Sequence, residues 1–176
     1  MPTPDSKPTR FNPLLTVLLI IAASRLLTMV FIPFTEPTEP RYAETARMMA
    51  ESGDWITPWF DYGVPFWGKP PLSFWLQALS FRLLGVSEFS ARFPAWIATV
   101  GSGMLVYALG GVLANRRTAF WSTLIFATMA VTYVAAGAVM TDAFLVFGTT
   151  LSLVSIAMVA NGLTAGWRWA FLDRKR

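Results

Sequence analysis

Four long apolar stretches decide which folds are open to this chain. They cover residues 13–34, 94–113, 119–139 and 143–161. Each has roughly the 20 residues that a helix needs to cross the hydrocarbon core of a bilayer. The chain is 55% hydrophobic and 14% charged, whereas soluble domains carry about 25% charged residues. The pattern predicts an all-α integral membrane protein with about four transmembrane helices.

The absence of two residue types limits the catalytic groups that this chain can use. The 176 residues include neither cysteine nor histidine, which excludes disulfides, thiolate nucleophiles and imidazole bases. Any catalysis depends on carboxylates, Lys, Arg, Tyr, Ser or Thr. Basic residues flank the apolar stretches instead of gathering on one soluble face, which argues against nucleic acid as a partner. The sequence indicates no cofactor, and a divalent metal ion has no specific support. Arg25, inside the first apolar stretch, needs either a partner or a route to the membrane surface.

Charge asymmetry between the segments predicts their orientation. Residues 1–12, the 115–117 loop and residues 164–176 together contain eight basic and two acidic side chains. Segment 35–92 contains seven acidic and five basic ones. Basic loops stay on the cytoplasmic side of a membrane. We therefore expect residues 1–12 and 164–176 to be cytoplasmic tails of a membrane domain, residues 13–163, with segment 35–92 outside.

The external segment 35–92 is expected to contain two short helices. The first is expected to begin at Pro40, where the missing N–H is tolerated, and to end at Gly53. The second is expected to begin at Pro70 and to end before Gly85. At about 1.5 Å per residue it spans roughly 20 Å, which is too short to cross a bilayer. Both helices are therefore predicted to be interfacial and to lie along the membrane surface.

Short motifs around this segment resemble those of a known family. They read RYAE at residues 41–44, GDW-x-x-P at 53–58 and KPPL-x-x-W at 69–75, followed by EFSARFPA at 88–95. In this order they resemble the first external loop of bacterial polyprenyl-phosphate-sugar glycosyltransferases. These enzymes are relatives of the protein O-mannosyltransferases and of the lipid A aminoarabinose transferase. The resemblance covers roughly residues 14–163.

The resemblance implies the N-terminal part of a C-type glycosyltransferase fold in a bacterial inner membrane. The implied activity is transfer of a sugar from a polyprenyl-phosphate donor to an external lipid, glycan or protein acceptor. Family members are typically several times longer, so whether this chain is itself active stays open. A small non-enzymatic membrane scaffold or interaction subunit is the competing interpretation. A small-molecule transporter has less support, because few charges lie within the apolar stretches.

Two carboxylates are candidates for the catalytic base. The family usually has an Asp-Glu pair before x-Arg-Tyr, and here the pair is Thr38-Glu39, so the resemblance gives the base role to Glu39 alone. Asp142 matches a Thr-Asp element at the external end of a span. Each has a structural alternative as a helix N-cap, because Glu39 precedes Pro40 and Asp is a common capping residue. Glu36 is a fallback acid.

Three cations are candidates for binding the donor phosphate. Lys69 matches a family lysine, whereas Gly68 stands where the aminoarabinose transferases have an acid, which argues against a metal site of that kind and against that substrate. Arg41 and Arg92 are secondary candidates. The alternative for Lys69 is a side chain that extends to lipid headgroups. Aromatic residues are expected either to line a groove for sugar and isoprenoid lipid or to form an interfacial belt. These residues are Tyr42, Trp59, Phe66, Trp67 and Trp75.

Overall fold

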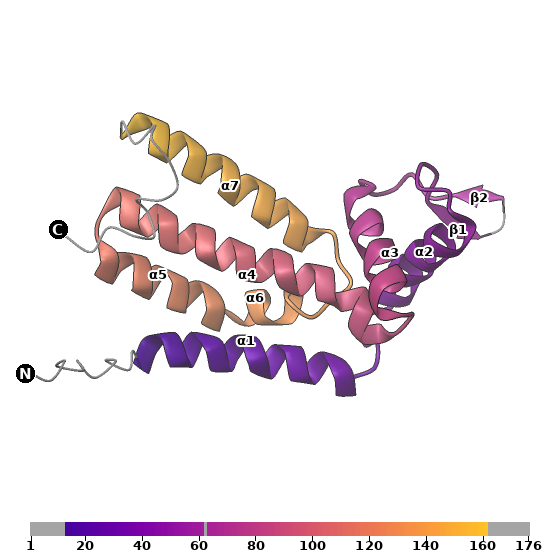
Figure 1. The fold of residues 1–176 in the computed structure, drawn as a ribbon, viewed down its shortest axis with the longest axis horizontal. Helices are drawn as coiled ribbons and strands as arrows, with labels where there is room; N and C mark the ends of the chain where they lie inside the picture. The colour runs from indigo at the N-terminus through magenta and orange to yellow at the C-terminus, as the bar shows by residue number, and fades with distance from the viewer. Residues whose placement is uncertain (1–12, 62, 162–176) are drawn as a thin grey trace, which may run out of the picture.

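The computed structural model describes residues 13–61 and 63–161. The predicted tails, 1–12 and 164–176, lie outside the described residues. Within the described part, seven helices and one two-stranded antiparallel hairpin follow one another along the chain (Figure 1). They are α1 (Pro13–Phe31), α2 (Thr38–Ser52), β1 (Trp59–Asp61), β2 (Val64–Pro65), α3 (Leu72–Leu84), α4 (Glu88–Leu113), α5 (Arg116–Thr128), α6 (Ala130–Ala135) and α7 (Asp142–Ala160).

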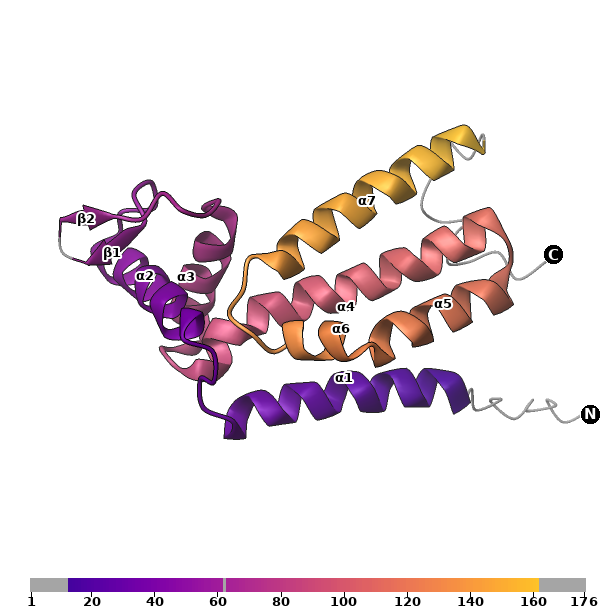
Figure 2. The ribbon, with the colours of Figure 1, turned by 180° about the vertical axis from the view of Figure 1, so that it is seen from behind.

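The elements divide into a bundle and a cap. In the bundle, α1, α4, α5 and α7 lie side by side with the short α6 among them, while α2, α3 and the hairpin form the cap at one end of α4 (Figures 1 and 2). The turn between α4 and α5 lies at the opposite end (Figure 1). Segment 35–92 and the 115–117 loop are therefore at opposite ends of the molecule. Which side of a membrane each end faces stays a prediction.

Two helices, α4 with 26 residues and α7 with 19, are long and apolar enough to cross a membrane by length and composition. Over residues 15–31, α1 is apolar but shorter, and so is α3. The structure confirms a mainly helical fold. The count of four spans and the interfacial position of α2 and α3 stay predictions.

The third predicted span, 119–139, is not one helix. α5 ends at Thr128, Met129 adopts an extended backbone (φ −62°, ψ 129°), and α6 has only six residues. The sequence between residues 119 and 136 contains neither Gly nor Pro, so no local signal marks the break. A tertiary contact binds the short helix after the break: Nη2 of Arg25 on α1 donates to the carbonyl oxygen of Val134 in α6, 2.9 Å away.

Local signals explain most helix boundaries in and near the cap. α2 and α3 end at Gly53 and Gly85, which have φ of +74° and +80°, as the sequence predicted. α4 begins at Glu88, earlier than the predicted residue 94. The reason is a capping box, in which Ser87 Oγ accepts from the N–H of Ser90 and Ser90 Oγ accepts from the N–H of Ser87.

Small residues let the bundle helices approach closely. A Cβ added at Gly110 of α4 would lie 2.6 Å from Cα of Ala119 on α5. A Cβ at Gly101 would lie 2.8 Å from the ring of Phe147 on α7. Such contacts stabilise helix pairs in membranes, where apolar burial alone does little. The cap has a core of its own, and Val139, from the segment before α7, belongs to it.

Candidate functional site

A buried ion pair joins the cap to the bundle. Glu39 lies in the first turn of α2, and Arg92 lies near the start of α4. Arg92 Nε donates to Glu39 Oε1 and Arg92 Nη2 donates to Glu39 Oε2, each at 3.1 Å. The two side chains are only 2–3% exposed. This two-pronged geometry is the strongest way for an arginine to bind a carboxylate.

The same arginine also fixes the end of α1. Nη1 of Arg92 donates to the carbonyl oxygen of Ile32 at 2.5 Å, and Nη2 donates to that of Pro33 at 3.1 Å. The ring of Phe34 lies 4.9 Å from the guanidinium carbon. All three guanidinium nitrogens are therefore bound to protein atoms. The structure gives Arg92, a predicted phosphate ligand, a role in joining three chain segments.

Backbone groups complete the surroundings of Glu39. Its Oε1 accepts from the N–H of Val139 at 3.0 Å, and its Oε2 accepts from the N–H groups of Thr35 at 3.1 Å and Glu36 at 3.4 Å. Burial raises the pKa of the Glu39 carboxyl, but hydrogen bonds from Arg92, Val139 and Thr35 outweigh burial and hold the pKa below its ordinary value. The carboxylate is thus ionised, buried and fully engaged. Glu39 is not the N-cap of α2, because the helix begins at Thr38 and its N-cap is Pro37.

Asp142 differs from Glu39 in exposure. It is the first residue of α7 and its side chain is exposed. The N-cap position belongs to Thr141, so the capping alternative for Asp142 does not hold. A negative charge in the first helical turn is favoured by the helix dipole. Val139, three residues earlier, is the one bound by Glu39, so the buried pair fixes the backbone that leads into Asp142.

The other predicted phosphate ligands lie on the surface of the cap. Lys69 is exposed and directly precedes Pro70 at the approach to α3. Arg41 is exposed on α2, and its guanidinium carbon lies 5.5 Å from the ring centre of Phe60. The structure therefore brings together Glu39 and Arg92 as a buried pair. It leaves Lys69 and Arg41 available to a ligand.

The predicted aromatic groove separates into core and surface residues. Tyr42 is buried and Phe66 half-buried; their rings lie 6.0 Å apart and both pack against the fully buried Phe74. Tyr42 is thus a core residue, which contradicts its predicted place in an open groove. Trp67 is 69% exposed and Trp75 40% exposed. These two can still contact a ligand or a membrane surface.

The GDW-x-x-P motif has a structural explanation. Asp54 Oδ1 accepts from the N–H groups of Ile56 and Thr57, each at 3.0 Å, and Oδ2 accepts from Nε1 of Trp59 at 3.0 Å. The bond from Thr57, then those from Trp59 and Ile56, hold the pKa of the Asp54 carboxyl below its ordinary value. Asp54 thus organises the turn before β1. Trp59, half-buried and tied to this turn, is less available to a ligand than Trp67.

A family model described as dolichyl-phosphate-mannose-protein mannosyltransferase matches residues 13–173. The chain belongs to this family.

Relatives in the same family show how much of such a protein is present. The chain is 37% identical over 93 residues to the undecaprenyl phosphate-alpha-4-amino-4-deoxy-L-arabinose arabinosyl transferase of Shewanella sediminis, covering 53% of this chain and 17% of that protein. It is 33% identical over 141 residues to the protein of the same name from Yersinia pestis, covering 80% and 23%. This mannosyltransferase-family chain therefore spans about a quarter or less of the length of these relatives.

A solved structure shares the fold. The crystal structure of ArnT from Cupriavidus metallidurans in the apo state matches with a TM-score of 0.75 and 23% identity. The match covers 82% of this chain and 27% of the other. The bundle and cap thus share the fold of the corresponding part of that protein.

Two features of this family member were not predicted from its sequence. The first is the contact of Arg25 with α6; a charge inside an apolar stretch was the signal, but it gave no partner. The second is the binding of the Val139 N–H by Glu39, for which the sequence has no signal. Among residues 13–61 and 63–161, no group of three or more His, Cys, Asp or Glu side chains could hold a metal ion.

Proposed function

We propose that this chain is the N-terminal part of a glycosyltransferase that takes a sugar from a polyprenyl-phosphate donor in a bacterial inner membrane. The acceptor is a lipid, glycan or protein outside the cell. Membership of the family and the names of the relatives support the donor class. The charge difference between the two ends of the bundle supports placing the cap outside and the chain ends in the cytoplasm.

The observation that carries this proposal is the fixed presentation of Asp142. The Glu39–Arg92 pair binds the N–H of Val139 and leaves the nearby Asp142 carboxylate exposed. An exposed carboxylate can approach an acceptor hydroxyl, whereas the five donors around Glu39 occupy its oxygens. The geometry therefore favours Asp142 as the base and Glu39 as the group that positions it.

The proposed reaction is a single displacement at the anomeric carbon. The acceptor oxygen attacks this carbon while Asp142 takes the hydroxyl proton, and the bond from the carbon to the phosphate oxygen breaks. The lipid phosphate leaves with the electron pair. Lys69 and Arg41 stabilise the charge that develops on this phosphate. Trp67 and Trp75 provide exposed aromatic surface for the sugar or the isoprenoid chain.

The experiment is donor binding and sugar transfer with the chain reconstituted in liposomes. A labelled polyprenyl-phosphate sugar is the probe. Saturable binding that Lys69→Ala weakens and Lys69→Arg partly preserves supports the proposal, because the phosphate needs a positive charge at this place. Binding that is equal in wild type and Lys69→Ala, with no transfer, supports a non-enzymatic membrane scaffold instead.

A further inference from the structure

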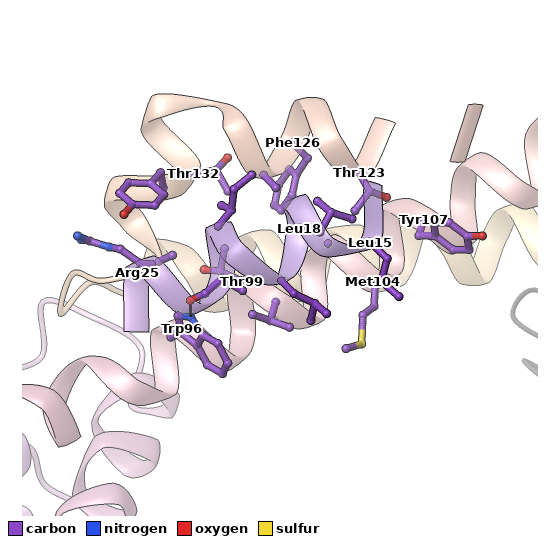
Figure 3. Close-up of a pocket in the computed structure, with 18 of the residues that line it drawn as sticks. Leu15, Leu18, Arg25, Trp96, Thr99, Met104, Tyr107, Thr123, Phe126 and Thr132 are labelled. Atoms are coloured by element: carbon purple, nitrogen blue, oxygen red, sulfur yellow. Dashed lines mark hydrogen bonds between the residues drawn. The ribbon is translucent and has the colours of Figure 1, made fainter. Parts of the chain in front are cut away.

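A cavity of about 400 Å³ lies in the bundle, between α1, α4, α5 and α6. Its volume is within the range of about 300–1,000 Å³ that is typical of small-molecule sites. Figure 3 shows lining side chains from these helices around one elongated space, with Arg25 toward one end and Tyr107 toward the other. Its apolar lining includes Leu15, Leu18, Met104 and Phe126. The cavity is separate from the cap residues assigned to the donor.

The charges in the cavity wall have one sign. Arg25 and Arg116 line it, and among residues 13–61 and 63–161 no acidic side chain does. Arg25 is engaged inside the bundle, because Nη2 donates to Val134 O and its guanidinium carbon lies 5.2 Å from the Tyr133 ring centre. Arg116 is exposed at the start of α5, where the positive end of the helix dipole adds to its charge. The end at Arg116 therefore attracts an anion.

The length of the cavity fits a single lipid chain. Lining residues on α5 extend from Arg116 to Ala127, which at about 1.5 Å per residue is roughly 16 Å. This is about half of the roughly 30 Å hydrocarbon thickness of a bilayer, the depth reached by the chains of one leaflet. Basic pockets between membrane helices on the cytoplasmic side are suited to anionic headgroups.

We propose that this cavity binds an anionic phospholipid of the leaflet at the α4–α5 turn. One acyl chain fills the space between α1, α4 and α5, and the headgroup phosphate contacts Arg116. This site is additional to the proposed donor site, which lies at the other end of the bundle; only its cytoplasmic placement rests on the proposed function.

The test uses the full chain in detergent micelles, with lipids added before native mass spectrometry. Phosphatidylglycerol should bind more tightly than phosphatidylcholine with the same acyl chains. Arg116→Gln should weaken phosphatidylglycerol binding about fivefold, the usual effect of one cation near a lipid surface. The matched control is Arg117→Gln, because Arg117 does not line the cavity. Equal losses in both variants would show general surface attraction and overturn the proposal.

A second pair of variants tests the cavity itself. Gly103 lines the cavity, and a Cβ there meets only ordinary contacts at 3.9–4.0 Å from Phe126 and Thr123. Gly103→Phe should therefore fill the space and abolish phosphatidylglycerol binding. Gly111→Phe, on the same helix with nothing within 4 Å, should leave binding unchanged. Unchanged binding in Gly103→Phe, or stronger binding of polyprenyl phosphate at this site, would overturn the proposal.

Discussion

The guanidinium of Arg25 packs directly against Gly137, so that a Cβ at residue 137 would overlap it. The same guanidinium donates to the carbonyl oxygen of Val134. Arg25 thus holds the C-terminal end of α6 and the residues just after it against α1. These residues lead to Val139 and Asp142, so two contacts, from Arg25 and from Glu39, fix the segment before α7.

Gly137→Ala should destabilise the protein. The new methyl group displaces the Arg25 guanidinium, and losing its bond to Val134 O inside the bundle costs about 1–3 kcal/mol. Thermal unfolding in detergent measures the change. Gly148→Ala on α7 is the control, since nothing lies within 4 Å of its added Cβ and the substitution favours a helix. Equal stability of the two variants would contradict the packing of Arg25 on Gly137.

Breaking the Glu39–Arg92 ion pair should lower the free energy of unfolding. Glu39→Gln leaves the Arg92 charge buried without its partner, which typically costs about 3–5 kcal/mol. Arg92→Gln should cost a similar amount, and the double variant should cost less than the sum of the two. A double-mutant cycle from denaturant unfolding measures this coupling. Strictly additive losses would mean that the two side chains act independently.

Lowering the pH should reduce the stability of the folded protein, partly because Glu39 becomes protonated. Its folded pKa lies below its ordinary value of about 4.3. Its stabilising contribution is therefore complete above that ordinary value and is lost as the pH falls through the folded pKa. Melting temperatures of wild type should fall from about pH 5 downward. Glu39→Gln should show a shallower fall, with the remaining slope due to other acids such as Asp54, whose pKa is also lowered.

Substitution of Asp142 and of Glu39 should distinguish the proposed general base from the residue that positions it. In a preparation that transfers sugar, Asp142→Asn should lower turnover by roughly 10²–10⁴, the usual contribution of a general base. Its melting temperature should stay near that of wild type, because the side chain is exposed. Glu39→Gln should lower turnover and melting temperature together. Normal turnover in Asp142→Asn would show that Asp142 is not the general base.

Donor affinity should depend on charge at Lys69. The side chain is exposed beside Pro70, so Lys69→Ala should raise the KM for the donor without changing thermal stability. Lys69→Arg should recover much of the affinity. Arg47→Ala is a suitable control, because Arg47 forms surface ion pairs with Glu44 and Glu51 on α2. An equal KM effect in Arg47→Ala would indicate general attraction of an anionic lipid.

Helix ends that depend on a single residue type were predictable from the sequence, whereas contacts between distant residues were not. Gly53 and Gly85 end helices because their backbones have positive φ, a property of glycine that needs no partner. The break at Met129 has no local signal of this kind, and the short α6 that follows it is bound by Arg25 of α1, more than 100 residues earlier in the chain. The apolar run around Met129 therefore predicted an unbroken span that the structure does not contain.

The candidate site shows the same division. Lys69 and Asp142, which the motif resemblance singled out, are both exposed in the structure. The resemblance made Glu39 a candidate base, and no signal in the sequence indicated the long-range partners that occupy its carboxylate. Its partners come from the start of α4 and from the segment before α7. Tyr42 joined the core because Phe66 and Phe74 pack on it.

The bonds of Glu39 also set an order of events during synthesis. Its partners lie at separations of 4 residues at Thr35, 53 at Arg92 and 100 at Val139. The first bond can form as soon as α2 has left the ribosome, and the second only after the start of α4 has followed. The third waits until the residues before α7 have been made. Throughout translation of α4, α5 and α6 this carboxylate lacks its bond from Val139, so its set of partners is complete only after the residues that lead into α7 have been made.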